Sequence, residues 1–144
     1  MGLVPFVWER KQIFEKGPSM PNIPKLLVVD DSQAVRISVK RILTKAGYEV
    51  ITANDGFEAL DRLNEEPSLM VLDVNMPGMD GYGVCEKMLE AGEQYKRFPV
   101  VFLTSVENKA LEMLGNEFGA YLNKPVSEQE LLTLVKNQLA LAAG

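Results

Sequence analysis

The sequence contains no histidine and only one cysteine, Cys85. Without histidine there is no imidazole for general acid–base catalysis, for a His-containing catalytic triad or for most zinc sites. A single cysteine cannot form a disulfide within the chain, which fits a reducing compartment. These absences exclude several common enzyme classes.

Long apolar runs and an excess of positive charge are also missing. No apolar stretch approaches the roughly 20 residues that a membrane-spanning helix needs, and the N-terminus lacks the basic segment of a signal peptide. The formal net charge of the 144-residue chain is −5, so we expect no direct binding of nucleic acid, which requires a basic surface. With 47% hydrophobic and 24% charged residues, the composition is typical of a globular domain. We expect a cytoplasmic protein.

Residues 1–24 are set apart by composition. They include the bulky apolar residues Phe6 and Trp8, and three prolines follow within residues 18–24. Such proline clusters are typical of linkers. We therefore expect an N-terminal extension with a Pro-rich linker over residues 1–24 and one domain over residues 25–144. The sequence leaves open whether the extension is a mobile tail or docks on the domain or on another protomer.

From Lys25 onward one pattern recurs five times: a short apolar strand, a polar residue at its end, and an amphipathic helix. The strands are expected at residues 26–29, 48–53, 68–73, 99–103 and 120–123. Such alternation predicts an α/β fold, a parallel sheet with helices on both faces. Strands that are apolar throughout agree with this, since a parallel sheet is buried on both sides.

The helices carry start signals and buried stripes at helical spacing. Two capping boxes are expected, formed by Asp55 with Glu58 and by Ser127 with Glu130. The helix after the third strand is expected to bury Val84, Met88 and Leu89. The helix after the fourth strand is expected to bury Leu111, Leu114 and Phe118.

Polar residues stand at the C-terminal ends of four of the strands: Asp30, Asp31, Asp73, Thr104 and Lys124. Open parallel sheets bind ligands outside these ends, so we expect the five side chains to meet at one edge. A lone Asp73 could be a helix cap, or an accessible but rigidly held nucleophile or metal ligand. Five residues placed alike favour a functional site.

The chemistry of this set indicates phosphoryl transfer. Three converging carboxylates repel one another, and a divalent cation removes that repulsion. A site with oxygen ligands alone favours Mg²⁺ or Mn²⁺. Lys124 adds a cation and Thr104 a hydroxyl donor, which suits an anion held beside the metal. In-line transfer to the carboxylate of Asp73 would give an aspartyl phosphate.

Four motifs in this order carry a family resemblance: VVDDS at 28–32, LDVNMPGMDG at 72–81, LTS at 103–105 and YLNKP at 121–125. Together, over about residues 25–142, they resemble the receiver domain of the response regulators of two-component signalling. The resemblance implies a flavodoxin-like (βα)5 fold with the strand order 2-1-3-4-5.

The resemblance also implies a role for each site residue. Asp73 would accept the phosphoryl group. Asp31, Asp73 and the backbone carbonyl of Asn75 would bind Mg²⁺ directly, and Asp30 through water. Lys124 would pair with the phosphoryl oxygens, while Thr104 and Tyr121 would act as the switch.

The partners and the backbone follow from the same resemblance. A sensor histidine kinase or phosphotransfer protein would donate the phosphoryl group from a phosphohistidine, and the receiver would catalyse its own phosphorylation and dephosphorylation. Its output would be a docking surface for a downstream protein or a missing output domain. The Lys124–Pro125 bond is expected to be cis. Val106 is expected to slow hydrolysis of the phosphoryl group.

One departure and several alternatives stay open. Thr104 and Lys124 are 124 − 104 = 20 positions apart, which indicates a shortened loop before Tyr121. A haloacid-dehalogenase-like phosphohydrolase would need a second Asp where this chain has Asn75. A receiver-fold interaction module that takes no phosphate would not need the full set of site residues. A flavin site would place a phosphate against Asp30. A homodimer, the cognate kinase and the output partner are not decided by the sequence.

Overall fold

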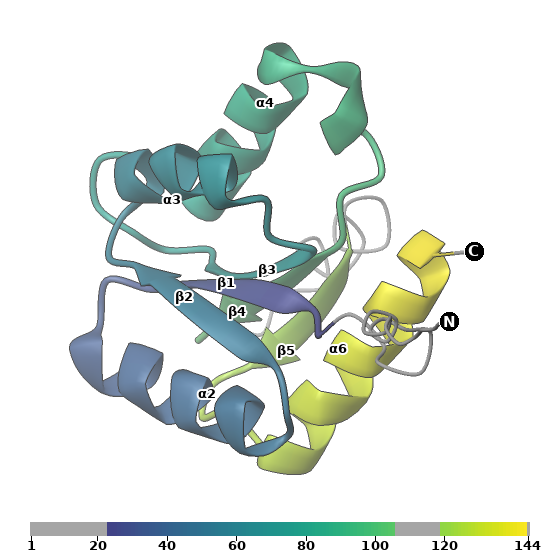
Figure 1. The fold of residues 1–144 in the computed structure, drawn as a ribbon. Coiled ribbons are helices and arrows are strands. Elements are labelled where there is room, and N and C mark those ends of the chain that lie inside the picture. Colours follow the sequence, from purple (N-terminus) through teal and green to yellow (C-terminus); the bar gives the residue numbers. More distant parts are fainter. Residues whose placement is uncertain (1–22, 106–118, 144) are drawn as a thin grey trace, which may run out of the picture.

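The structure, a computed structural model, describes residues 23–105 and 119–143. Residues 1–22, the helix expected to bury Leu111, Leu114 and Phe118, and Val106 lie outside the described residues. The described elements follow the expected alternation of strands and helices (Figure 1): β1 (Lys25–Val29), α2 (Gln33–Lys45), β2 (Glu49–Ala53), α3 (Gly56–Arg62), η1 (Leu63–Glu65), β3 (Leu69–Asp73), α4 (Gly81–Ala91), η2 (Glu93–Tyr95), β4 (Val100–Thr104), β5 (Ala120–Asn123) and α6 (Glu128–Ala143).

The five strands form one parallel sheet in the order β2-β1-β3-β4-β5. This confirms the predicted strand order. Leu26 lies opposite Leu69, and the next residue of β3, Met70, lies opposite Val100. Because the strands start level with one another, their carboxyl ends also share one edge of the sheet.

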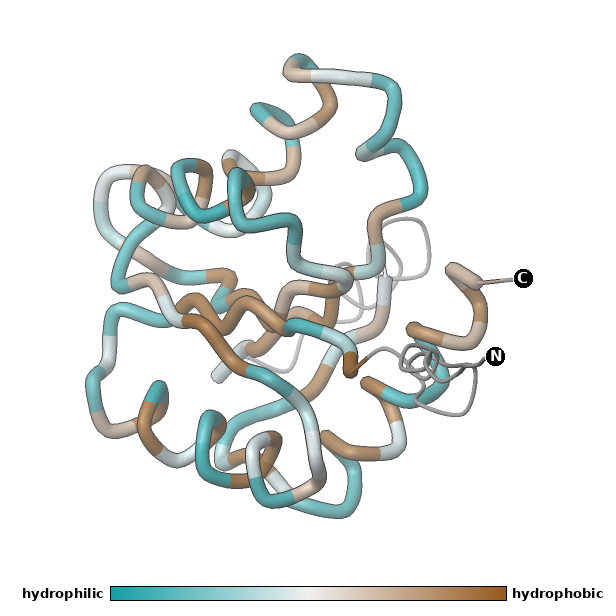
Figure 2. The backbone as a smooth tube through the Cα atoms, viewed as in Figure 1, coloured by the Kyte–Doolittle hydropathy of each residue, from teal (hydrophilic) through white to brown (hydrophobic). Residues whose placement is uncertain are grey.

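Alternate strand residues build two separate cores. Leu26 and Val28 of β1 pack on the face that α2 and α6 cover, and Leu27 and Val29 pack on the face of α3 and α4 (Figure 1). Figure 2 shows hydrophobic residues concentrated along the strands between the two helix layers. Burial on both faces explains why the strands read as continuous apolar runs.

Side-chain caps start the helices where the sequence indicates. Asp55 accepts a hydrogen bond from the backbone N–H of Glu58 at 2.8 Å, and Ser127 accepts one from Glu130 at 3.3 Å. The carboxylate of Glu58 accepts from the N–H of Asn54, one residue before the cap of the predicted box. None of the described helices is long and apolar enough to cross a lipid bilayer.

One predicted core position is wrong. Helix α4 buries Val84 and Met88, but Leu89 is 45% exposed. Successive helical residues are about 100° apart, so a helix that turns Met88 toward the sheet turns Leu89 partly away from it.

Candidate functional site

The structure brings the predicted polar residues together at the carboxyl edge of the sheet. Carboxylate oxygens of Asp30, Asp31 and Asp73 all lie within 4.8 Å of one another. The Nζ atom of Lys124, one residue beyond β5, lies 2.9 Å from Oδ2 of Asp30 and 3.4 Å from Oδ1 of Asp73. Thr104, the last residue of β4, is buried at the same edge. The predicted convergence is confirmed.

The degree of burial differs from the prediction for Asp73. Its residue is only 2% exposed, and Asp30 is also buried, whereas Asp31 is exposed. Asp73 ends the central strand, which has β1 on one side and β4 on the other. The carboxylate is therefore rigidly held but not freely accessible, and the site opens to solvent on the side of Asp31.

Backbone N–H groups orient both buried carboxylates. The N–H of Ser32 donates to Oδ1 of Asp30 at 2.8 Å, and the N–H of Asn75 donates to Oδ1 of Asp73 at 3.2 Å. Each donor lies two residues after its acceptor, so the loop that follows each strand fixes its own carboxylate. Hydrogen bonds of this kind favour the charged form of a carboxyl group.

Two glycines let the loop after β3 pass close to Asp73. Gly78 has a φ of +84°, a conformation that side chains disfavour. A Cβ atom on Gly81 would lie 2.7 Å from the carbonyl oxygen of Asp73 and 3.1 Å from Cα of Val74. The N–H of Gly81 also donates to the carbonyl of Val74 at 2.9 Å. The first residue of α4 therefore packs directly on the backbone that carries Asp73.

Opposing effects set the charge of the site. Burial, together with the negative charge of Asp30, raises the pKa of Asp73 to about 6, although Lys124 and the N–H of Asn75 act to lower it. Burial acts to lower the pKa of Lys124, but its hydrogen bonds and ion pairs with Asp30 and Asp73 outweigh this and raise the pKa. A single ammonium thus faces several carboxylates, and one further positive charge would relieve their repulsion.

An aromatic cluster lies behind Thr104. The rings of Phe102 and Tyr121 stack with centroids 5.0 Å apart, and Tyr82 lies 5.6 Å from Phe102. The hydroxyl groups of Tyr82 and Tyr121 form a hydrogen bond. Burial and this hydrogen bond raise the pKa of Tyr121. Tyr121 was predicted from its motif, but nothing in the sequence singled out Tyr82 as its partner.

Two further features complete the local geometry. The Lys124–Pro125 peptide bond is cis, as predicted. Nη1 of Arg36, in α2, donates to the backbone carbonyl of Asp30 at 2.6 Å. The sequence analysis missed Arg36. Its place in the first turns of the helix that follows Asp30 is the signal that would have suggested it.

Comparisons with known proteins agree with this geometry. The sequence model of the Response regulator receiver domain matches residues 26–136. A probable transcriptional regulator, ycf27, of Cyanophora paradoxa is 41% identical over 121 residues, which cover 82% of this chain and 49% of the relative. Protein PilG of Pseudomonas aeruginosa is 36% identical over 115 residues, which cover 78% of this chain and 84% of PilG.

Solved structures give the same result. The crystal structure of a response regulator from Chloroflexus aurantiacus, described there as putative, superposes with a TM-score of 0.74 at 38% identity. The match covers 83% of this chain and 99% of that one. The chain spans about half the length of the transcriptional regulators that it matches, so the match concerns their receiver portion.

Proposed function

The chain belongs to the response regulator receiver family, and from this premise we propose that it accepts a phosphoryl group on Asp73 in a two-component signalling system. One observation carries the proposal. The carboxylate of Asp73 is held beside two other carboxylates and 3.4 Å from the ammonium of Lys124. A carboxylate nucleophile with a cation beside it is the arrangement that phosphoryl transfer requires.

The donor set fits Mg²⁺. Three carboxylates within 4.8 Å offer oxygen ligands only, which hard divalent cations prefer. We propose that Asp31, Asp73 and the backbone carbonyl of Asn75 hold the ion directly and that Asp30 acts through water. When bound, Mg²⁺ would neutralise carboxylate charge and the negative charge of the phosphoryl oxygens.

In the proposed reaction the donor is a phosphohistidine on a sensor histidine kinase or phosphotransfer protein. A carboxylate oxygen of Asp73 forms the new O–P bond as the P–N bond of the donor breaks, and the leaving imidazole nitrogen takes up a proton. Lys124 then pairs with a phosphoryl oxygen, and the hydroxyl of Thr104 donates to another. Asn75, rather than an acidic side chain, stands two residues after Asp73, which disfavours a phosphohydrolase of the haloacid-dehalogenase type.

The signalling context is part of the same proposal. Residues 25–144 form the receiver, and residues 1–24 form the extension with its linker. Phosphorylation alters a docking surface for a downstream protein or for an output domain of a longer regulator. The movement of Thr104 and Tyr121 couples the site to that surface. The protein acts in the cytoplasm and does not bind nucleic acid through this domain.

Phosphoramidate tests the donor chemistry, because its P–N bond resembles that of phosphohistidine. With Mg²⁺, intact-mass spectrometry should show the addition of one phosphoryl group, and excess EDTA should prevent it. The Asp80→Asn variant is the control, since Asp80 is an exposed cap of α4, and it should be phosphorylated like the parent. Absence of the adduct with Mg²⁺ would favour an interaction module that takes no phosphate.

A further inference from the structure

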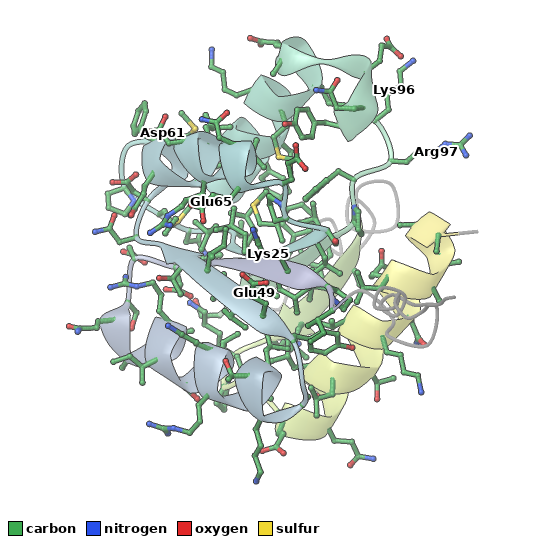
Figure 3. The ribbon with its side chains drawn as sticks, viewed as in Figure 1. Lys25, Glu49, Asp61, Glu65, Lys96 and Arg97 are labelled. Atoms are coloured by element: carbon green, nitrogen blue, oxygen red, sulfur yellow. The ribbon has the colours of Figure 1, made fainter. Side chains whose placement is uncertain are left out.

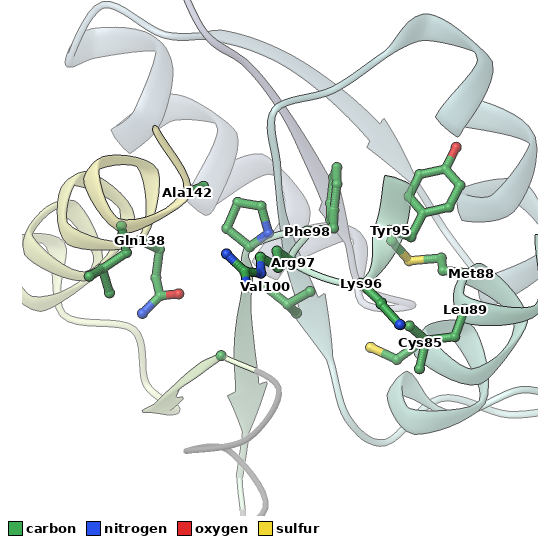
Figure 4. Close-up of a pocket in the computed structure, with 13 residues that line it drawn as sticks. Cys85, Met88, Leu89, Tyr95, Lys96, Arg97, Phe98, Val100, Gln138 and Ala142 are labelled. Carbon is green, nitrogen blue, oxygen red and sulfur yellow. The ribbon is translucent and has the colours of Figure 1, made fainter. Parts of the chain in front are cut away.

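A hollow of about 600 Å³ lies on the side of the sheet opposite to the phosphorylation site, where the strands begin. Figure 4 shows it between the end of α4 and the end of α6, with Val100 at the start of β4 between them. The buried side chains of Cys85 and Met88 contribute to its lining. The size is that of a site for a bulky apolar group.

Apolar side chains around this hollow are left in solvent by the described residues. Leu89 is 45% exposed and Leu141 is 73% exposed, and both line the hollow. Tyr95 and Phe98, which also line it, form an edge-to-face pair with ring centroids 5.9 Å apart. Clustered apolar and aromatic groups of this kind mark contact surfaces.

Positive charge borders the same surface. Lys96 and Arg97 line the hollow, and Figure 3 shows both side chains projecting outward from the turn after α4. A guanidinium or ammonium beside aromatic rings favours an aromatic ligand through cation–π contact. The surface therefore suits an aromatic side chain that is followed by an acidic one.

The chain itself supplies a segment with that chemistry. In the extension, Phe6, Val7 and Trp8 are followed directly by Glu9. The extension joins the domain at β1, which starts at the same edge of the sheet as β4. From β1 to β4 is two strand spacings, about 10 Å. The 23 − 8 = 15 residues from Trp8 to Ile23 span up to about 50 Å when extended.

We propose that the N-terminal extension docks into this hollow of its own domain, with Trp8 as its anchor and Glu9 beside Lys96 and Arg97. Tethering favours this occupant over a separate protein, because a short linker gives an effective concentration on the order of millimolar. The extension then covers Leu89 and Leu141, which the described residues leave exposed. The inference does not depend on phosphorylation.

Trp8 is the only tryptophan of the chain, so its fluorescence reports the docking directly in the full-length protein. In the parent we expect emission at shorter wavelength than N-acetyl-tryptophanamide in the same buffer, and several-fold weaker quenching by acrylamide. Leu89→Glu and Leu141→Glu should each move both values toward those of the free compound. The control is Ile37→Glu: Ile37 is 48% exposed, matching Leu89, but lies on α2 at the other face of the sheet. It should leave both values unchanged.

Three results would overturn the proposal. The first is solvent-like emission and quenching in the parent. The second is a shielded Trp8 that neither glutamate variant exposes; because Leu141 is so exposed, its substitution does not threaten folding, which far-UV circular dichroism verifies. The third is shielding that disappears on dilution, since it would place the extension on a second copy of the chain.

Discussion

The hydrogen bond between Tyr82 and Tyr121 joins two helix and strand residues that are 39 positions apart. Helical periodicity gives no reason to pair them, because the contact depends on how α4 packs on the sheet. Tyr82 sits one residue after Gly81, so the close packing of Gly81 on the Asp73 backbone also sets the position of this hydroxyl. The predicted switch residue thus has a partner that only the structure reveals.

The Tyr82→Phe variant should lose stability, because it leaves the partly buried hydroxyl of Tyr121 without this partner. We expect a loss of about 1 kcal/mol in the free energy of unfolding. Urea unfolding of Tyr82→Phe, Tyr121→Phe and the double variant measures the coupling between the two hydroxyls. Losses that simply add in the double variant would show that the hydroxyls do not interact.

Cys85 should make the stability of the protein depend on alkaline pH. Burial, with the nearby charges of Asp80 and Glu86, raises the pKa of this thiol from 9.0 to about 12. The folded state therefore holds the proton more tightly than the unfolded state. This contribution to stability is complete below pH 9 and is lost as the pH rises toward 12.

We expect the free energy of unfolding of the parent to fall between about pH 8 and about pH 10 by roughly 1 kcal/mol more than that of Cys85→Ala. Urea titrations of both proteins at the two pH values give the difference. The comparison within each protein removes the constant cost of the smaller side chain. Equal falls in the two proteins would mean that the thiol is not shielded as the structure has it.

At the scale of the elements, the start of α4 is the most sensitive junction. A Cβ on Gly81 would meet the backbone of Asp73 at 2.7 Å, whereas at Gly83 it would meet the flexible side chain of Met79 at 3.0 Å. Gly81→Ala must therefore shift either the helix or the strand end that carries the nucleophile. Gly83→Ala needs only a side-chain adjustment.

Gly81→Ala is expected to lower the free energy of unfolding by about 1–3 kcal/mol and to slow phosphorylation of Asp73. Gly83→Ala, the matched control in the same helix, should be close to neutral or up to about 1 kcal/mol more stable. Urea unfolding and the rate of phosphorylation by acetyl phosphate measure the two effects. Normal stability and rate in Gly81→Ala would contradict the close packing at this junction.

Local patterns predict the elements but not all of their packing. The apolar run at 69–72 predicts a strand buried on both faces, and β3 is the central strand. That central place also buries Asp73, which we expected to be accessible, because proline and glycine punctuation reveals a loop but not its neighbours. For Leu89, spacing alone does not say which of two adjacent helical residues faces the sheet.

At the scale of the whole molecule, the site was predictable because parallel strands that start level also end level. Asp30, Asp73, Thr104 and Lys124 are far apart in the sequence, yet each stands at or directly after a strand end, so topology alone brings them together. The precise pairing of Lys124 with Asp30 at 2.9 Å and with Asp73 at 3.4 Å was not predictable. It depends on how β5 and the turn after it lie against the other strand ends.

The most direct test of the account is the location of the phosphoryl group. The parent and Asp73→Asn are incubated with acetyl phosphate and Mg²⁺, and the adduct is measured by intact mass and then mapped to a peptide. We predict one phosphoryl group in the parent, on the peptide that contains Asp73, and none in Asp73→Asn, which should be as well folded as the parent. Full phosphorylation of Asp73→Asn at another residue would contradict the central claim.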